Sequence, residues 1–198
     1  MTLDDLIDAG EIAALERAYG PFPRQHHRLK MGADQIEWWT EKTLHDRRGE
    51  VVLLIHRGSK LLLHTKEFYP PGVYRLLTGG VSWGEAVTDA LRREVYEETG
   101  LAVQNERLLG LLSYEFQDRG RSAPFASYVF LLPGGKGRPA VQDEDEDISD
   151  FKWTPISELP AIAASLRSVP EDSPGRRDWG RFRALAHEFA AHRLRDKE

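Results

Sequence analysis

Residues 79–101 read Gly-Gly-Val-Ser-Trp-Gly-Glu-Ala-Val-Thr-Asp-Ala-Leu-Arg-Arg-Glu-Val-Tyr-Glu-Glu-Thr-Gly-Leu. Three carboxylates of this stretch, Glu94, Glu97 and Glu98, have the spacing i, i+3, i+4, which places them on one face of a helix. Like charges on one face repel each other by roughly a few tenths of a kcal/mol per pair. Magnesium binds proteins through a few carboxylates and would remove that repulsion. The segment therefore predicts a helix that carries a divalent-metal site.

The constrained spacing extends beyond the three glutamates. Gly79 is followed after five residues by Glu85, and after seven more by residues 93–101, which read Arg-Glu-Val-Tyr-Glu-Glu-Thr-Gly-Leu. This pattern resembles the complete sequence box of the Nudix hydrolase family. Average residue usage gives a chance match to all of its positions a probability on the order of 10⁻⁷. The alternative interpretation is an acidic helix face in solvent.

The resemblance implies a role for each charged residue of the helix. In this family, the glutamates at the positions of Glu94 and Glu98 bind the metal most directly. The glutamate at the position of Glu97 contributes directly or through water. The arginine at the position of Arg93 orients the carboxylates through ion pairs. We therefore expect all four to belong to the catalytic site.

The remaining positions of the box are expected to shape its loop. Gly79 and Gly80 would let the backbone turn sharply and approach the metal, and Gly80 itself is a candidate carbonyl ligand. Ser82 and Glu85 have capping-box spacing, so Glu85 is expected to hold the loop rather than the metal. Gly100 fits the left-handed residue that ends a helix.

Composition limits the class of protein. The chain has 198 residues, 40% of them hydrophobic, with a net charge of −5 and no cysteine, which excludes disulfides and thiolate metal sites. No apolar run reaches membrane-spanning length, and the acidic N-terminus is unlike a secretory signal. We therefore expect a cytoplasmic protein without a membrane partner. The negative charge also argues against a nucleic-acid partner.

The same charge bears on the cofactor. A polyphosphate substrate would be repelled by the glutamate cluster unless a divalent ion reversed the local sign. We therefore expect Mg²⁺ as the cofactor, with Mn²⁺ able to substitute, and a small-molecule nucleotide as the substrate.

The rest of the chain predicts an α+β fold. A helix is expected over residues 3–19 with a break at Gly10, then a loop carrying His26 and His27. A short helix over 161–168 and a final helix after the break at 173–175 are expected near the C-terminus. Strands are expected at 38–44, 51–56, 60–65, 74–78, 106–116, 122–132 and 151–155.

The Nudix resemblance covers residues 37–165 and implies an α/β/α sandwich with a mixed sheet. Residues 1–36 and 166–198 lie outside it and are expected to form N- and C-terminal helical extensions. Either extension could pack on the domain or build a homodimer.

The general base is sought outside the box helix. Nudix enzymes differ on whether it lies in the box or on a distal loop. Residues 143–147 form an acidic run where such a distal acid often occurs, and Glu144 and Glu146 are the candidates. The alternative interpretation of this run is a flexible charged loop.

Substrate contacts are less well defined by the sequence. Aromatic residues could stack on a base and basic residues could meet a phosphate. The candidates are Trp38, Trp39, Tyr69 and Tyr74 for stacking, and Arg75 and Lys66 for phosphate contacts.

Features that mark particular Nudix substrates are absent. Residues 114–118 lack the proline typical of ADP-ribose hydrolases, Tyr114 falls too early for a dinucleoside-polyphosphate hydrolase, and no coenzyme A element precedes the box. The widest safe class is a nucleoside diphosphate derivative such as a nucleotide sugar, an ADP-ribose-like molecule or a nucleoside triphosphate. A prenyl diphosphate isomerase would need a catalytic cysteine. A non-catalytic nucleotide-sensing module remains the alternative, although such relatives commonly lose box carboxylates.

Overall fold

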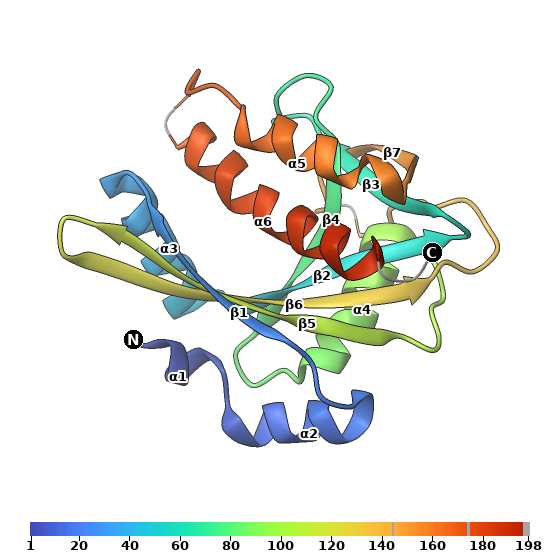
Figure 1. Cartoon of the computed structure of the whole chain (residues 1–198), viewed down its shortest axis with the longest axis horizontal. Coiled ribbons are helices and arrows are strands. Elements are labelled where there is room, and N and C mark those ends of the chain that lie inside the picture. Colours follow the sequence, from blue (N-terminus) through green and yellow to red (C-terminus); the bar gives the residue numbers. More distant parts are fainter. Residues whose placement is uncertain (144, 174, 196–198) are drawn as a thin grey trace.

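A seven-stranded mixed sheet forms the centre of the computed structural model, which describes residues 1–143, 145–173 and 175–195 (Figure 1). The strand order is β1-β5-β6-β2-β4-β3-β7. Two pairs, β1 with β5 and β2 with β6, are parallel, and the other neighbours are antiparallel. The strands are β1 (Arg24–Lys30), β2 (Arg47–Arg57), β3 (Lys60–Lys66), β4 (Arg75–Ser82), β5 (Arg107–Asp118), β6 (Arg121–Pro133) and β7 (Ile148–Pro155).

Helices cover both faces of the sheet (Figure 1). One face packs against α2 and α4, and the other against α3, α5 and α6. The predicted α/β/α sandwich is therefore confirmed. The helices are α1 (Leu3–Leu6), α2 (Ala9–Tyr19), α3 (Ala33–His45), α4 (Val87–Thr99), α5 (Leu159–Arg167) and α6 (Arg176–Arg195), with a 3₁₀ turn η1 (Ile156–Glu158) before α5.

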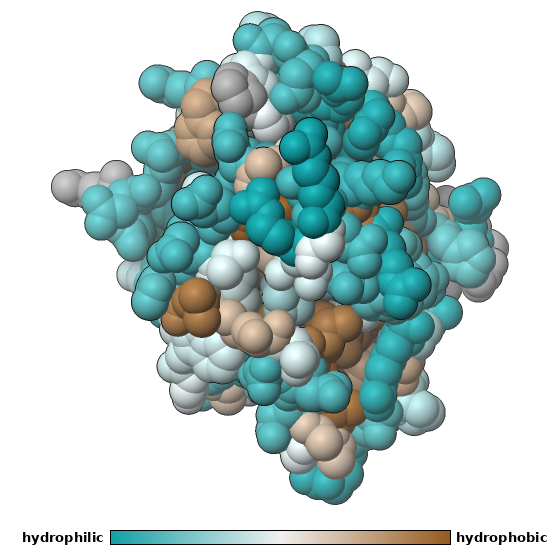
Figure 2. Space-filling model, turned by 90° about the vertical axis from the view of Figure 1, so that its left-hand side faces the viewer, coloured by the Kyte–Doolittle hydropathy of each residue, from teal (hydrophilic) through white to brown (hydrophobic). Residues whose placement is uncertain are grey.

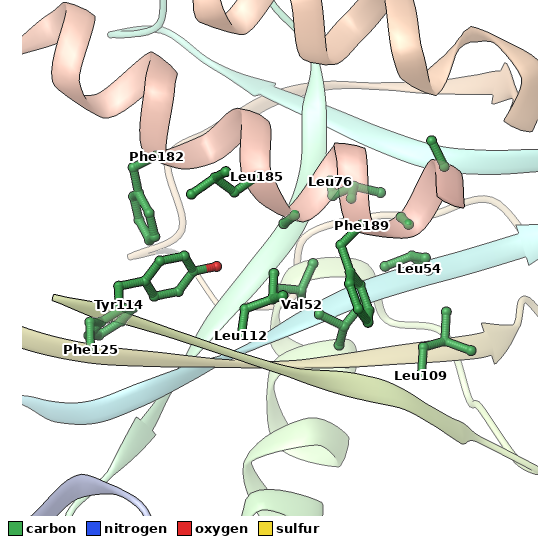
Figure 3. Packing of buried hydrophobic residues seen from close by; sticks show 14 of the residues in the cluster. Val52, Leu54, Leu76, Leu109, Leu112, Tyr114, Phe125, Phe182, Leu185 and Phe189 are labelled. Atoms are coloured by element: carbon green, nitrogen blue, oxygen red, sulfur yellow. The ribbon is translucent and has the colours of Figure 1, made fainter. Parts of the chain in front are cut away.

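The central strand β2 shows why the sheet needs two covering layers. Its residues 51–55 are all fully buried apolar side chains, as expected of a strand covered on both faces. Val52 and Leu54 point to the layer of α6, whose Phe182 and Phe189 pack over them and their neighbours (Figure 3). Val51, Leu53 and Ile55 belong to the layer of α2 and α4.

Two segments differ from the sequence prediction. Residues 38–44, expected as a strand, lie within α3, because Ile36, Trp39 and Thr43 recur at helical spacing and are buried on one side. The predicted loop around His26 and His27 is the edge strand β1, which pairs in parallel with β5. β-forming aromatic residues misled the first prediction, and polar side chains on an edge strand misled the second.

Two local predictions are corrected in position. The N-terminal helix breaks at Ile7 and Asp8 rather than at Gly10, because the Asp8 side chain caps α2 by accepting a hydrogen bond from the Glu11 N–H (2.7 Å). Gly79 and Gly80 do not form a turn. They lie inside β4, where they pair with β2.

The outer surface over the α3 end is mainly hydrophilic, and its hydrophobic residues form small separate patches (Figure 2). Within the described ranges, no helix combines the length and apolar character needed to cross a bilayer.

Candidate active site

Helix α4 positions the box glutamates against the sheet. Its apolar residues Ala90, Leu91 and Val95 are buried in the layer that covers β2 and β4. This packing turns Glu94 and Glu98 inward, where they are 5% and 1% exposed. Gly100 ends the helix in the left-handed conformation (φ 62°), as predicted.

A cluster of three carboxylates stands at the C-terminal half of α4. Glu94, Glu98 and Glu146 each offer one oxygen, and these oxygens all lie within 4.8 Å of one another. Glu146 comes from the segment before β7, so a residue of the predicted distal acidic run is brought to the helix. Glu144, the other candidate from that run, lies outside the described residues. We call Glu94, Glu98 and Glu146 the carboxylate cluster.

Glu97 is not a member of the carboxylate cluster. Its side chain accepts a hydrogen bond from Arg93 Nη1 (2.8 Å) and is 29% exposed. Its backbone carbonyl accepts a hydrogen bond from the Gln142 N–H (2.8 Å), which attaches the acidic run to α4. The structure therefore groups Glu146, rather than Glu97, with the two buried box glutamates.

Arg93 connects the parts of the box. Its Nη1 donates to Glu94 Oε1 (2.8 Å) as well as to Glu97, and its Nη2 donates to the Gly80 carbonyl (2.8 Å). Its Nε donates to Glu85 Oε1 (2.9 Å). These acceptors raise the pKa of Arg93, with Glu85 contributing most. Arg93 thus fixes Glu94 relative to β4 and to the loop before the helix.

The loop of the box is held as its spacing predicts. Glu85 Oε2 accepts a hydrogen bond from the Ser82 N–H (3.0 Å) and also from Arg93 Nη2 (3.0 Å). Its hydrogen bonds to Arg93 and to Ser82, together with the positive charges of Arg93 and Arg48, keep the Glu85 pKa low despite the opposing effect of partial burial. Glu85 is therefore committed to the loop.

Gly79 is fixed by close approach rather than by backbone conformation. A Cβ atom at this position would lie 1.9 Å from Glu94 Cδ. Because carbon atoms meet at about 3.5–4.0 Å, only glycine leaves room for the buried Glu94 side chain.

The carboxylate cluster fits a hard divalent cation. Glu98 is completely enclosed, and within the described chain its Oε2 has no hydrogen-bond partner. Burial, followed by the negative charges of Glu146 and Glu94, raises the Glu98 pKa well above its usual value. Burial also raises the pKa of Glu94. A cation among these oxygens would offset both the desolvation and the mutual repulsion, and oxygen donors of this kind suit Mg²⁺.

A cavity of about 440 Å³ adjoins the carboxylate cluster. It lies between α3, β4, the loop after β3 and the start of α6, and Glu94 and Glu146 form part of its wall. A volume of this size is typical of small-molecule sites. Trp38, Phe68 and Trp179 provide aromatic surface on its wall, with Trp38 and Phe68 half exposed or more (50% and 58%).

The structure places most, but not all, of the predicted substrate contacts at the cavity. Arg75, Lys66, Tyr69 and the Trp pair at 38–39 line the cavity, although Trp39 is 5% exposed and packs mainly in the aromatic core. Lys66 Nζ donates to Glu146 Oε2 (2.8 Å). Tyr74 is not among the residues that line the cavity, and its hydroxyl forms a hydrogen bond with Asp150.

Several lining residues were not predicted. Lys42 and Arg47 border the cavity from α3 and β2, whereas Arg176, Trp179 and Arg183 reach it from α6. Their positions depend on how α3 and α6 pack over the sheet. The Gly32 N–H donates to Asp178 Oδ2 (2.8 Å), which joins the start of α3 to the start of α6. No sequence pattern connects segments so far apart.

Comparison with known proteins decides the family. A family model described as the NUDIX domain matches residues 43–173. This chain belongs to the Nudix hydrolase family. The expectation from the box is thereby confirmed, and the match supports a Nudix pyrophosphohydrolase.

Curated relatives within the family include NAD-capped RNA hydrolase NudC of Pasteurella multocida, 32% identical over 114 residues, covering 56% of this chain and 40% of the relative. NAD-capped RNA hydrolase NudC of Pseudomonas aeruginosa is 34% identical over 119 residues, covering 60% of this chain and 40% of the relative. The chain thus spans about two fifths of these relatives. A solved MutT Nudix hydrolase from Burkholderia pseudomallei has a TM-score of 0.47 and 23% identity, covering 70% of this chain and 94% of that one.

Proposed function

We propose that this chain hydrolyses a diphosphate linkage in a nucleoside diphosphate derivative, using Mg²⁺ or Mn²⁺ held at the carboxylate cluster by Glu94 and Glu98. One observation carries the proposal. Three carboxylate oxygens converge within 4.8 Å beside a cavity, and Glu98 among them has a buried oxygen without a partner in the described chain. Membership in the Nudix family supports the reaction class.

Some residues of the site are proposed as metal ligands, and Arg93 is proposed to keep them in position. When bound, the metal neutralises the diphosphate and makes a water more acidic. Glu98 and Glu94 are the proposed ligands from α4, with Glu146 facing them. Arg93 keeps Glu94 in place by a hydrogen bond and holds the Gly80 carbonyl, which we propose as a further ligand through its second lone pair.

Among the residues that the structure describes, Glu146 is the proposed general base. Its Oε2 is held by Lys66 Nζ (2.8 Å), and its carboxylate lies beside both box glutamates. One carboxylate oxygen then remains to take a proton from the attacking water. Glu144 stays the second candidate, and Glu97 is proposed to act through Arg93 or through water.

The cavity supports a substrate that combines an aromatic base with phosphates. Trp38, Phe68 and Trp179 offer stacking surface, and basic residues line the same cavity as Glu94 and Glu146. The names of the NudC relatives put NAD and NAD-capped RNA in the range of substrates to test. The net charge of −5 does not exclude an RNA-linked substrate, because recognition of a cap needs only the nucleotide end.

The test is product formation from a panel of nucleotides by wild type and Glu98→Gln, in Mg²⁺ and in EDTA. The panel holds ADP-ribose, a nucleotide sugar, a nucleoside triphosphate, a dinucleoside polyphosphate, NADH, NAD and NAD-capped RNA. We expect turnover of at least one member that requires both the metal and Glu98. Glu158→Gln, a change at an exposed position, is the matched control and should keep full activity.

The alternative, a non-catalytic nucleotide sensor, is distinguished by the same samples. A sensor would bind a panel member tightly without any metal-dependent product. That result would overturn the proposed function. Turnover that survives in Glu98→Gln would reject the assignment of the carboxylate cluster.

A further inference from the structure

The cationic side chains that line the cavity differ in whether they form an ion pair. There are six of them, and five form an ion pair with a carboxylate. Arg75 forms none within residues 1–143, 145–173 and 175–195. The ion pairs are Lys42 and Arg47 with Asp46, Lys66 with Glu146, Arg176 with Asp172, and Arg183 with Glu50.

Arg75 is only 5% exposed, so an unpaired charge at this position is costly. Neutral acceptors fix its guanidinium from two sides. Nε donates to Tyr69 Oη (2.8 Å), and Nη1 donates to the Leu76 carbonyl (2.8 Å) and to Thr78 Oγ1 (3.0 Å). Three of the five N–H donors are used in this way.

The remaining nitrogen, Nη2, forms no hydrogen bond with any residue that the structure describes. It is also not a fully buried atom. Arg75 lines the cavity, and its unpartnered Nη2 is the donor that it can offer to a ligand there.

The buried guanidinium of Arg75 would be stabilised by a bound anion. A guanidinium removed from water is costly unless a negative group compensates it. Burial lowers the Arg75 pKa, while the charges of Glu50 and Glu98 act on it without forming an ion pair. Glu50 is already paired with Arg183, and Glu98 is the proposed metal ligand. Neither carboxylate is therefore free to neutralise Arg75 in the working enzyme.

We propose that Arg75 is a preformed anion site that binds oxygens of the substrate's diphosphate group beside the carboxylate cluster. This inference rests on the proposed function. The position suits a diphosphate because the same cavity wall carries Glu94 and Glu146, so one phosphoryl group can meet Arg75 while the metal site holds its neighbour. Charge-assisted hydrogen bonds from a fixed guanidinium favour such oxygens in particular.

A purely structural role for Arg75 makes a different prediction. In that case the side chain would serve to join Tyr69 and Thr78 to β4, and its positive charge would be incidental. Replacing it by a neutral side chain of similar length would then cost stability. If it is an anion site, the same replacement removes a buried charge and leaves stability unchanged or higher.

The experiment measures binding of ADP and of inorganic pyrophosphate to the whole chain in Mg²⁺, by calorimetry, for wild type, Arg75→Met, Arg75→Lys and Arg57→Met. Mg²⁺ is present because the carboxylate cluster would otherwise repel both probes, and product analysis after each titration checks that neither probe has been hydrolysed. Arg57 is the matched control, because it also donates to neutral carbonyls, those of Gly134, Gly135 and Gly137, but lies outside the cavity. Melting temperatures are recorded without ligand.

We expect Arg75→Met to weaken binding of both probes at least tenfold, with an unchanged or higher melting temperature. Arg57→Met should bind as wild type. Unchanged affinity in Arg75→Met, a loss matched by a lower melting temperature, or a wild type that binds neither probe would overturn the proposal. A loss for ADP alone would also overturn it, because Arg75 would then contact the nucleoside.

Two further results keep the test decisive. If Arg75→Met does not fold, Arg75→Lys decides: weaker binding by about threefold or more in a folded chain supports a site that needs two N–H groups, and wild-type affinity contradicts it. If the substrate panel shows no hydrolysis but Arg75 still controls pyrophosphate binding, the proposed function fails while the anion site stands.

Discussion

Replacing Gly79 by alanine tests the close packing of the box most sharply. The new Cβ atom would lie 1.9 Å from Glu94 Cδ and 2.1 Å from both Cγ and Oε2. Normal carbon contacts need about 3.5–4.0 Å, so the Glu94 side chain must move by roughly 1.5–2 Å. Because β4 is held by pairing with β2, the side chain rather than the strand is expected to yield.

The displacement is large compared with what a metal site tolerates. Magnesium requires ligands at about 2.0–2.1 Å in near-octahedral geometry. A shift of this size takes Glu94 out of the ligand set and breaks its hydrogen bond with Arg93. Changes that only disturb the orientation of ligands cost about 10–100-fold in metal affinity or activity, so loss of a ligand should cost at least about 100-fold.

The assay is titration of Mn²⁺ into metal-free protein, followed by turnover of the substrate found in the panel. Gly32→Ala is the matched control, since a Cβ at Gly32 would have its nearest contact at 3.9 Å and the backbone there is extended. We expect the control to bind metal like wild type. A Gly79→Ala protein with wild-type metal affinity and turnover would refute the reasoning.

Three further outcomes are expected. Glu98→Gln should lower turnover by about 10³-fold with a melting temperature at or above that of wild type, because a buried carboxyl without a partner is replaced by a neutral group; near-normal turnover would contradict this. Burial lowers the pKa of His187 to about 4 in the folded chain. Between pH 6.5 and 4, this histidine is therefore protonated in the unfolded chain but mostly neutral in the folded chain. His187 should therefore make the free energy of unfolding fall by about 3 kcal/mol from pH 7 to pH 4, and His187→Gln, unlike His192→Gln, should flatten that dependence in urea titrations. Trp38→Ala should raise KM for a base-containing substrate by about 2–10-fold, whereas Trp83→Ala, at an exposed tryptophan outside the cavity, should not. Equal KM values in the two tryptophan variants would remove the stacking role.

The box could be predicted from the sequence because its residues are local. Glu94 and Glu98 share one helix, so their convergence follows from helical periodicity, and the partnership of Glu85 with Ser82 follows from capping-box spacing. The role of Gly79 could be seen only in the structure. This position must lack a side chain because Glu94, fifteen residues later in the chain, occupies the space that a Cβ atom would need.

The rest of the site depends on long-range packing. Glu146 reaches Glu94 and Glu98 because its loop is attached to α4 through Gln142 and to β3 through Lys66, and no local pattern specifies either attachment. Residues 38–44, which lie within α3, read as a strand in the sequence because their tryptophans favour strands when judged by residue type alone. Only tertiary contacts reveal that α3 and α6 meet over the cavity, and that Arg75 lacks an acidic partner among the described residues.

The central claim is that the carboxylate cluster holds the catalytic metal, and direct Mn²⁺ binding to wild type and Glu98→Gln without substrate tests it most directly. Electron paramagnetic resonance counts bound Mn²⁺ regardless of which substrate the enzyme uses. The account predicts saturable binding to wild type and affinity at least about 100-fold weaker in Glu98→Gln. Equal binding by the two proteins, or no binding by wild type, would contradict it.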